Sequence, residues 1–164
     1  IQNWPEEINI TKKTIDVDLN LETNFGPESI KNNIDSKPEF VWMTAESLGD
    51  NDPALNYYSN LPAVFIFDKP LLNYLQLSTK RIIFLLDCLR ELANKRSTQV
   101  YLDNPIEYLK NKNFASTFAA VPKYKKITRV NIPTTEFPSV RLVKPINFYP
   151  SSYSSWKKRI ELNI

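Results

Sequence analysis

The sequence PAVFIFDKP at residues 62–70 decides the fold class. Its first part is a continuous apolar run, rich in β-branched and aromatic side chains, and such runs are typical of strands that are covered on both faces. Strands of this kind occur mainly in parallel sheets with helices packed on either side. Asp68 ends the run and, with Pro70 two residues later, is typical of a helix start.

The same signals recur on both sides of this stretch. Short apolar runs predict further strands, and Asp-Pro, Asn-Pro or Ser signals precede segments with helical periodicity. The expected strands span residues 40–43, 62–67, 98–102 and 115–121, and the expected helices span residues 53–59, 79–95 and 105–110, with a short helix after Pro70. This alternation predicts an α/β fold: a Rossmann-like open parallel sheet of four to five strands flanked by helices.

The ends of the chain have weaker patterns. Hydrophobic residues alternate over residues 14–21, which is the period of a strand with one buried face. Residues 127–132 and 139–143 are candidate strands, and five prolines between Pro122 and Pro150 argue against a long helix there. Residues 153–164 are expected to form a basic helix.

Charge divides the chain into three expected regions. They are an extended N-terminal arm (1–38), an α/β body (39–132) and a Pro-rich, basic C-terminal tail (133–164). The arm holds four lysines and seven acids, whereas residues 122–164 hold nine basic and two acidic side chains. The arm and the tail are therefore expected to differ from the body in the partners that they attract.

Composition excludes several functions. The chain has no histidine and one cysteine, which removes His-based catalysis and most zinc sites. Gly26 and Gly49 are far apart, so no glycine-rich phosphate loop is present. We therefore expect no enzyme and no cofactor. The longest apolar stretch is too short to span a bilayer, so the protein is expected to be soluble, in the cytoplasm or an equivalent organelle matrix or stroma.

Several segments occur in the order found at the start of photolyases and cryptochromes. They are VWM (41–43), LGDNDPAL (48–55), VFIFD (64–68), KR (80–81) with FLLDCL (84–89), and DNPIEYL (103–109). The chain thus resembles the N-terminal α/β domain of that family. The family's helical flavin-binding domain is not recognised in these residues, so the resemblance does not imply light-driven DNA repair.

The sequence also departs from the family. TAESL (44–48) stands where family members carry Arg-Asp-Leu-Arg, and AAVPK (119–123) stands where many have an Asn and Tyr-Glu signature that helps hold an antenna pigment. An antenna pigment or a nucleotide therefore remains an alternative implied by the resemblance.

Ligands of open parallel sheets bind at the carboxyl ends of the strands. Polar residues that follow the expected strands predict a pigment or nucleotide pocket there; the alternative is that Asp68 and Asp103 serve only as caps or turn residues. A second alternative treats Glu46, Asp50 and Asp52 as a metal or acid–base cluster, against ordinary polar loop residues. The predicted rim comprises Thr44, Ala45, Glu46, Asp68, Lys69, Asp103 and Lys123.

Cations interleaved with aromatic residues suit an acidic protein partner or nucleic acid. The candidate partner-binding residues are Trp4, Lys125, Lys126, Tyr153, Trp156, Lys157, Lys158 and Arg159. The main functional hypothesis is a non-catalytic accessory or structural component of a multiprotein assembly. The alternatives are a carrier of an antenna pigment or nucleotide, and a DNA-associated accessory to a separate flavoprotein.

Overall fold

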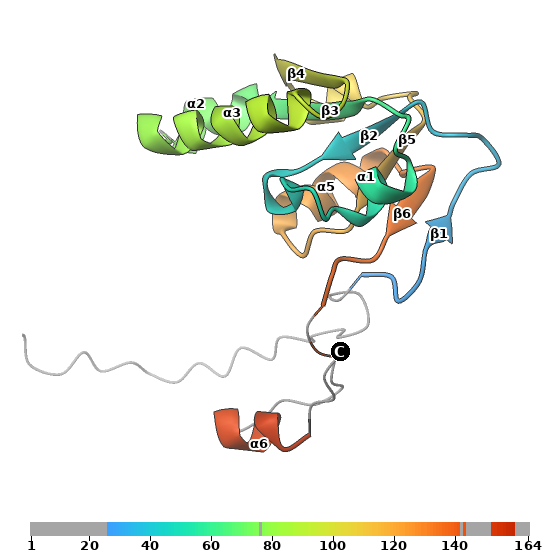
Figure 1. The fold of residues 1–164 in the computed structure, drawn as a ribbon, viewed down its shortest axis with the longest axis vertical. Coiled ribbons are helices and arrows are strands. Elements are labelled where there is room, and N and C mark those ends of the chain that lie inside the picture. The colour runs from blue at the N-terminus through green and yellow to red at the C-terminus, as the bar shows by residue number, and fades with distance from the viewer. Residues whose placement is uncertain (1–25, 76, 142, 144–151, 160–164) are drawn as a thin grey trace, which may run out of the picture.

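A six-stranded, mostly parallel sheet forms the centre of the protein. The computed structural model describes residues 26–75, 77–141, 143 and 152–159. The strand order is β1-β6-β5-β2-β3-β4; β1 is antiparallel to β6, and all other neighbours are parallel (Figure 1). The strands are β1 (Lys31–Asn32), β2 (Phe40–Met43), β3 (Ala63–Asp68), β4 (Thr98–Asp103), β5 (Phe114–Thr117) and β6 (Thr135–Phe137).

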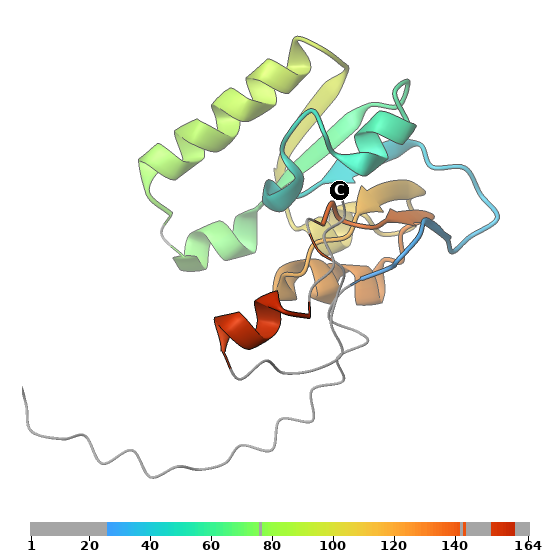
Figure 2. The same cartoon turned by 60° about the horizontal axis from the view of Figure 1, so that its bottom comes forward.

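Helices cover both faces of the sheet. Figure 2 shows α3 and α5 on opposite sides of it. The helices are α1 (Pro53–Tyr57), α2 (Lys69–Leu75), α3 (Thr79–Ala93), α4 (Pro105–Tyr108), α5 (Pro122–Val130) and α6 (Tyr153–Lys157), with a short 3₁₀ helix at Ala45–Ser47. The predicted α/β fold with an open parallel sheet is confirmed. No helix in the described ranges has the length and apolar content needed to cross a membrane.

Alternate residues of the strands build one core on each face, as the two-residue period of a strand requires. Val41 and Met43 of β2 pack with Leu89 of α3 on the first face. Phe40 and Trp42 point to the second face, where they pack with side chains of α4 and α5. The central strands are therefore buried on both sides, which explains their continuous apolar sequences.

Aspartate side chains start two of the helices, as predicted from the sequence. Asp52 Oδ1 accepts a hydrogen bond from Leu55 N (2.9 Å), and Asp68 Oδ1 accepts one from Leu71 N (3.0 Å). Such caps satisfy backbone N–H groups that have no partner within the helix. They also fix the direction in which each helix leaves the sheet.

The prediction was wrong after Pro122. Residues 127–130, expected in a strand, belong to α5, because Pro122 occupies the first helical turn, where its missing N–H is not needed. The last strand is β6 rather than residues 139–141, which form no strand. The basic helix α6 ends at Lys157, and residues 160–164 of the expected helix lie outside the described residues.

The sheet also extends beyond the expected body. β1 lies within the expected arm and β6 within the expected tail, so residues of all three expected regions contribute to one sheet. Residues 14–21 and Trp4 lie outside the described residues.

Candidate functional site

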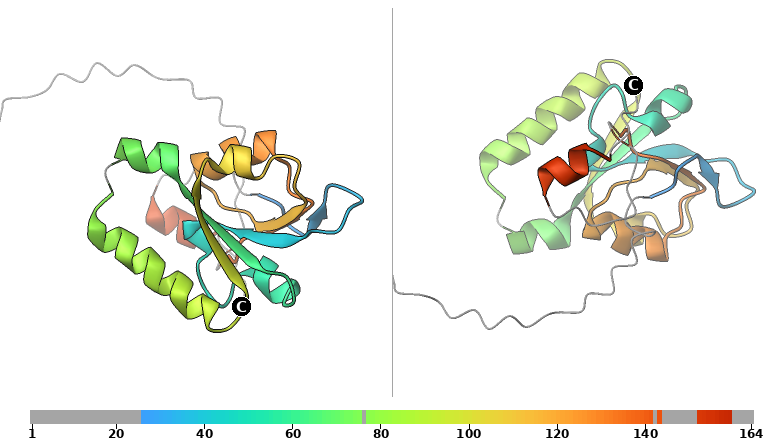
Figure 3. Two further views of the ribbon diagram at one scale, coloured as in Figure 1. Left: turned by 90° about the horizontal axis from the view of Figure 1, so that it is seen from above. Right: turned by 90° about the horizontal axis from the view of Figure 1, so that it is seen from below.

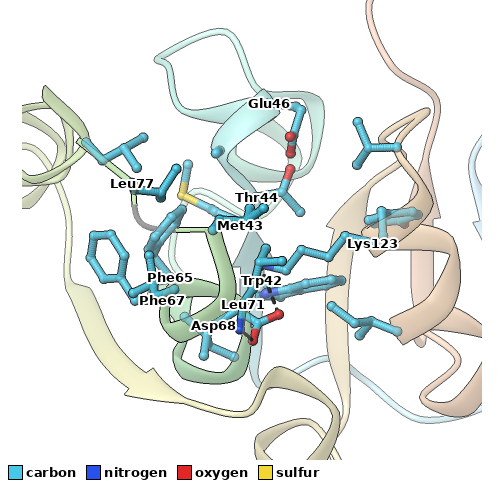
Figure 4. A pocket seen from close by; sticks show the side chains of 18 of the residues that line it. Trp42, Met43, Thr44, Glu46, Phe65, Phe67, Asp68, Leu71, Leu77 and Lys123 are labelled. Carbon is cyan, nitrogen blue, oxygen red and sulfur yellow. Dashed lines mark hydrogen bonds and ion pairs between the residues drawn. The ribbon is translucent and has the colours of Figure 1, made fainter. Parts of the chain in front are cut away.

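A cavity opens at the carboxyl ends of β2 and β3, where the sequence predicted a ligand site. Its volume is about 180 Å³. Trp42 and Met43 of β2, Phe65 and Phe67 of β3 and leucines of α2 form its wall (Figure 4). Mainly apolar walls with a few polar groups are typical of small-molecule sites.

The floor of the cavity is held in place by a stacked aromatic pair. The rings of Trp42 and Tyr124 are nearly parallel, with centroids 5.6 Å apart. The Tyr124 hydroxyl is 2.8 Å from Ser116 Oγ and donates a hydrogen bond to Glu136 Oε1 (2.8 Å). Because both the ring and the hydroxyl of Tyr124 are fixed, the indole of Trp42 presents a rigid face.

This environment also changes the acidity of Tyr124. Burial raises the pKa of the phenol well above its ordinary value, and the nearby Glu136 carboxylate raises it further. Tyr124 is therefore protonated at any physiological pH. It serves as a hydrogen-bonded support for the cavity and is a poor general base.

An ion pair borders the polar part of the cavity. Lys123 Nζ of α5 lies 3.4 Å from Asp68 Oδ2 at the end of β3, and the Asp68 side chain is only 16% exposed. Asp68 therefore caps α2 and also lines the cavity, so the two alternative interpretations of this residue are compatible. Arg81, from the first turn of α3, brings a second cation to the lining.

Thr44 and Glu46 enter the cavity from the loop after β2 (Figure 4). Thr44 Oγ1 is enclosed and has no hydrogen-bond partner among the described residues. Buried hydroxyls normally have such a partner, so Thr44 Oγ1 is an exception among the residues that line the cavity.

The structure brings together only part of the predicted rim. Thr44, Glu46 and Asp68, together with Ala45 and Lys123, line the cavity. Lys69 is exposed at the start of α2 and is not part of the lining. Asp103 ends β4 at the edge of the sheet, where its carboxylate accepts a hydrogen bond from Asn104 N (2.7 Å), so it acts as a turn residue.

Sequence reasoning missed the apolar wall. Trp42 had been placed in a core strand, Tyr124 had been given no role in the pocket, and the leucines of α2 gave no signal beyond a short helix. The missed residues that line the cavity include Trp42, Phe65, Phe67, Leu71, Leu72, Leu75, Leu77, Arg81, Tyr124 and Ile127.

A second, more polar hollow lies between β2 and β5, where the strand order changes direction. Its lining includes Asp52 and Thr117, and Glu46 borders both hollows. Asp52 is 6% exposed, and no hydrogen bond of normal geometry reaches its Oδ2 atom among the described residues. Burial raises the pKa of the Asp52 carboxyl, although the Leu55 N–H and the Thr117 hydroxyl oppose this.

The described residues contain no group of three or more side chains arranged to hold a metal ion. The predicted alternative of a metal cluster at Glu46, Asp50 and Asp52 is therefore not supported. Asp50 instead pairs with Lys95, which also lies 3.5 Å from Glu91.

Those of the predicted partner-binding residues that the structure describes do not line the cavity. Lys126 of α5 and Lys157, Lys158 and Arg159 at the end of α6 are exposed, whereas Lys125 is half-buried. In α6, Tyr153 is 71% exposed and its ring lies 5.4 Å from that of Trp156.

The fold and the cavity define a doubly wound α/β domain with a mainly apolar site at the carboxyl ends of its strands. Comparisons of the chain with models of protein families, with curated proteins and with solved structures give no match. The resemblance to photolyases and cryptochromes therefore stays a prediction from the sequence.

Proposed function

We propose that this protein is a non-catalytic carrier that binds a flat, largely apolar molecule with an anionic end, such as a pigment or a nucleotide. The cavity at the carboxyl ends of β2 and β3 is the observation that carries this proposal. Its apolar wall and its cations favour two different parts of one ligand.

The aromatic wall favours a ring system. The indole of Trp42 is stacked on Tyr124 and is only 3% exposed, so it offers the cavity a ring edge. Phe65 and Phe67 stand edge to face, with centroids 4.9 Å apart, and supply further aromatic surface. Ring systems gain from such walls because edge contacts between aromatic groups add to the burial of apolar area.

The cations favour an anionic group. Lys123 is 3.4 Å from Asp68 Oδ2, a distance too long for a strong hydrogen bond, and an ammonium group has three N–H donors. Arg81 supplies a planar guanidinium to the same lining. A phosphate or carboxylate that joins these two cations would be held by charge-assisted hydrogen bonds.

Fluorescence of Trp42 tests the proposal directly. Trp4→Phe and Trp156→Phe leave Trp42 as the single reporter, and flavin mononucleotide and riboflavin serve as probes that differ by one phosphate. We expect saturable quenching by both, with flavin mononucleotide bound about tenfold more tightly because of one charge-assisted contact. Quenching that rises linearly without saturation would contradict the proposal.

Matched lysine variants locate the site. Lys123→Met keeps the length of the side chain and removes its charge, so it should abolish the advantage of flavin mononucleotide over riboflavin. Lys126→Met removes an exposed charge three residues further along α5 and should leave both affinities unchanged. Equal effects of the two variants would show that the phosphate responds only to overall charge.

The exposed side chains of α6 favour a second function, that of an accessory component of an assembly. Tyr153, Lys157 and Lys158 offer an aromatic ring and two cations to an acidic surface. Cross-linking of native material from its source, followed by identification of the attached proteins, tests this. Recovery of the protein without any cross-linked partner would count against it.

A further inference from the structure

Strand β4 forms an open edge of the sheet. All six of its residues are in register with β3, and no strand of the described residues pairs with its other side. Figure 3 (left) looks onto this edge and shows β4 in front of β3, with helices to either side and no described segment across it. The edge therefore presents unpaired backbone N–H and C=O groups.

The open edge also carries apolar side chains. Val100 is 44% exposed and Leu102 is 62% exposed, and their register partners Phe65 and Phe67 place both on the face covered by α3. Leu86 of α3 is a further exposed apolar residue. Isolated exposed hydrophobic residues are ordinary, but here they accompany a free strand edge.

β4 lacks the features that normally protect such an edge. Residues 98–103 contain no lysine and no proline, and the unbroken register with β3 leaves no room for a bulge. Asp103, at the very end, is the only charged residue of the strand. An edge of this kind is suited to pairing with another strand.

We propose that β4 pairs antiparallel with β4 of a second copy of this chain, so that the two sheets become continuous across a two-fold axis. A two-fold axis perpendicular to the sheet keeps each face of one copy on the same side as that face of the other copy. Each residue of β4 must therefore lie opposite a residue whose side chain is on the same face. Centring the axis on Tyr101 meets this condition. It places Val100 opposite Leu102 twice, which covers the exposed apolar side chains of both copies.

The polar side chains complement each other in the same register. Gln99 then lies opposite Asp103 of the other copy, and no two acids face each other. The Tyr101 hydroxyl donates to Gln99 Oε1 (2.9 Å), which leaves the amide N–H groups of Gln99 free to donate to that carboxylate. β4 thus carries both the amide donor and the carboxylate acceptor of this contact. This self-complementarity favours a second copy of the chain over an unrelated strand as the partner.

Sedimentation equilibrium of the full chain across the micromolar range tests the proposal. We expect a dimer, and Leu102→Lys should weaken it at least about tenfold, because two cations are inserted into the joined strands. Val130→Lys alters a similarly exposed side chain on α5 (65% exposed) and should leave the dimer unchanged. A monomer at every concentration, or equal effects of the two variants, overturns the proposal.

Disulfide trapping tests the register. In a Cys88→Ser background, Tyr101→Cys should cross-link to itself under mild oxidation, because residues opposite each other in a strand pair lie at disulfide distance. Gln99→Cys should not, because it faces Asp103. Cross-linking of both variants to the same extent, or a dimer in which Tyr101→Cys does not cross-link, overturns the proposed interface.

Discussion

Replacing Tyr124 with Phe tests how the floor of the cavity is held. The change keeps the ring that stacks on Trp42 and removes the hydroxyl that contacts Ser116 and Glu136. Ser116 is fully buried, so its hydroxyl loses this contact and has no access to water. The expected cost at pH 8 is about 1–3 kcal/mol in the free energy of unfolding, the usual penalty for an unsatisfied buried polar group.

The effect should then shrink in alkali. Burial raises the pKa of Tyr124 above its ordinary value of 10.0, so the folded chain keeps a proton that the unfolded chain loses. This contribution to stability is fully present below pH 10 and is lost as the pH rises above it. By pH 11 this effect lowers the free energy of unfolding of the wild type by about 1.4 kcal/mol. Tyr124→Phe has no phenol at this position and does not show this decrease.

Urea unfolding at pH 8 and pH 11, followed by circular dichroism, measures both quantities. The stability gap between the wild type and Tyr124→Phe should narrow by about 1.4 kcal/mol. Burial also raises the pKa of Tyr108, but Tyr108 is present in both proteins and cancels in the difference. Tyr74→Phe, at a highly exposed site, should show no gap at either pH. A Tyr124 gap that is the same at both pH values would refute the reasoning.

Two further variants test groups near the site. Asp52→Asn keeps a good helix cap and removes a carboxyl group whose pKa is raised by burial. In thermal unfolding, the wild type should therefore lose stability relative to the variant as the pH rises from 3.5 to 6. A stability difference that does not change with pH would contradict this. Arg96 donates hydrogen bonds to the carbonyl oxygens of Leu55, Tyr58, Ser59 and Leu61. Arg96→Met should cost about 3 kcal/mol in urea unfolding, whereas Arg90→Met, which breaks only an exposed ion pair with Asp87, should cost less than about 0.5 kcal/mol.

The sequence was sufficient for the elements that combine a strong period with a cap. β3 was recognised from its continuous apolar run, and α3 from its leucine spacing after Ser78. Both signals arise from local chemistry, namely burial on two faces and satisfaction of the first N–H groups of a helix. The predicted boundaries consequently agree with the observed ones to within two residues.

The sequence was insufficient where tertiary contacts override local pattern. Residues 127–132 were a candidate strand, but Tyr124 and Ile127 are buried one helical turn apart in α5. β6 contains Thr135 and Glu136, and its only large apolar residue is Phe137. Thr135 can be buried there because its hydroxyl has two hydrogen-bond partners that are distant in sequence. They are the Tyr58 hydroxyl (3.2 Å) and Asn32 Oδ1 (3.2 Å).

The candidate site shows the same division. Polar residues after the strands marked the end of the sheet at which the cavity opens, because the carboxyl ends of the strands follow from strand direction alone. Strand order decides which of these polar residues come together. Asp68 lies on β3, next to β2, whereas Asp103 lies on the edge strand β4. Strand order is set by packing of whole helices, and no single residue of the sequence encodes it.

The cavity and the core share the same side chains, which links ligand binding to stability. Trp42, Ile66, Tyr124 and Ile127 belong to the core beneath α5 and also line the cavity. The atoms of these side chains that face the cavity lack the dispersion contacts that the other core atoms make. A molecule that fills the cavity restores those contacts only in the folded chain, so it must raise the free energy of unfolding, by about 2.7 kcal/mol at a concentration one hundred times its dissociation constant. Because the Tyr124 hydroxyl orients this wall, Tyr124→Phe should reduce ligand affinity as well as stability.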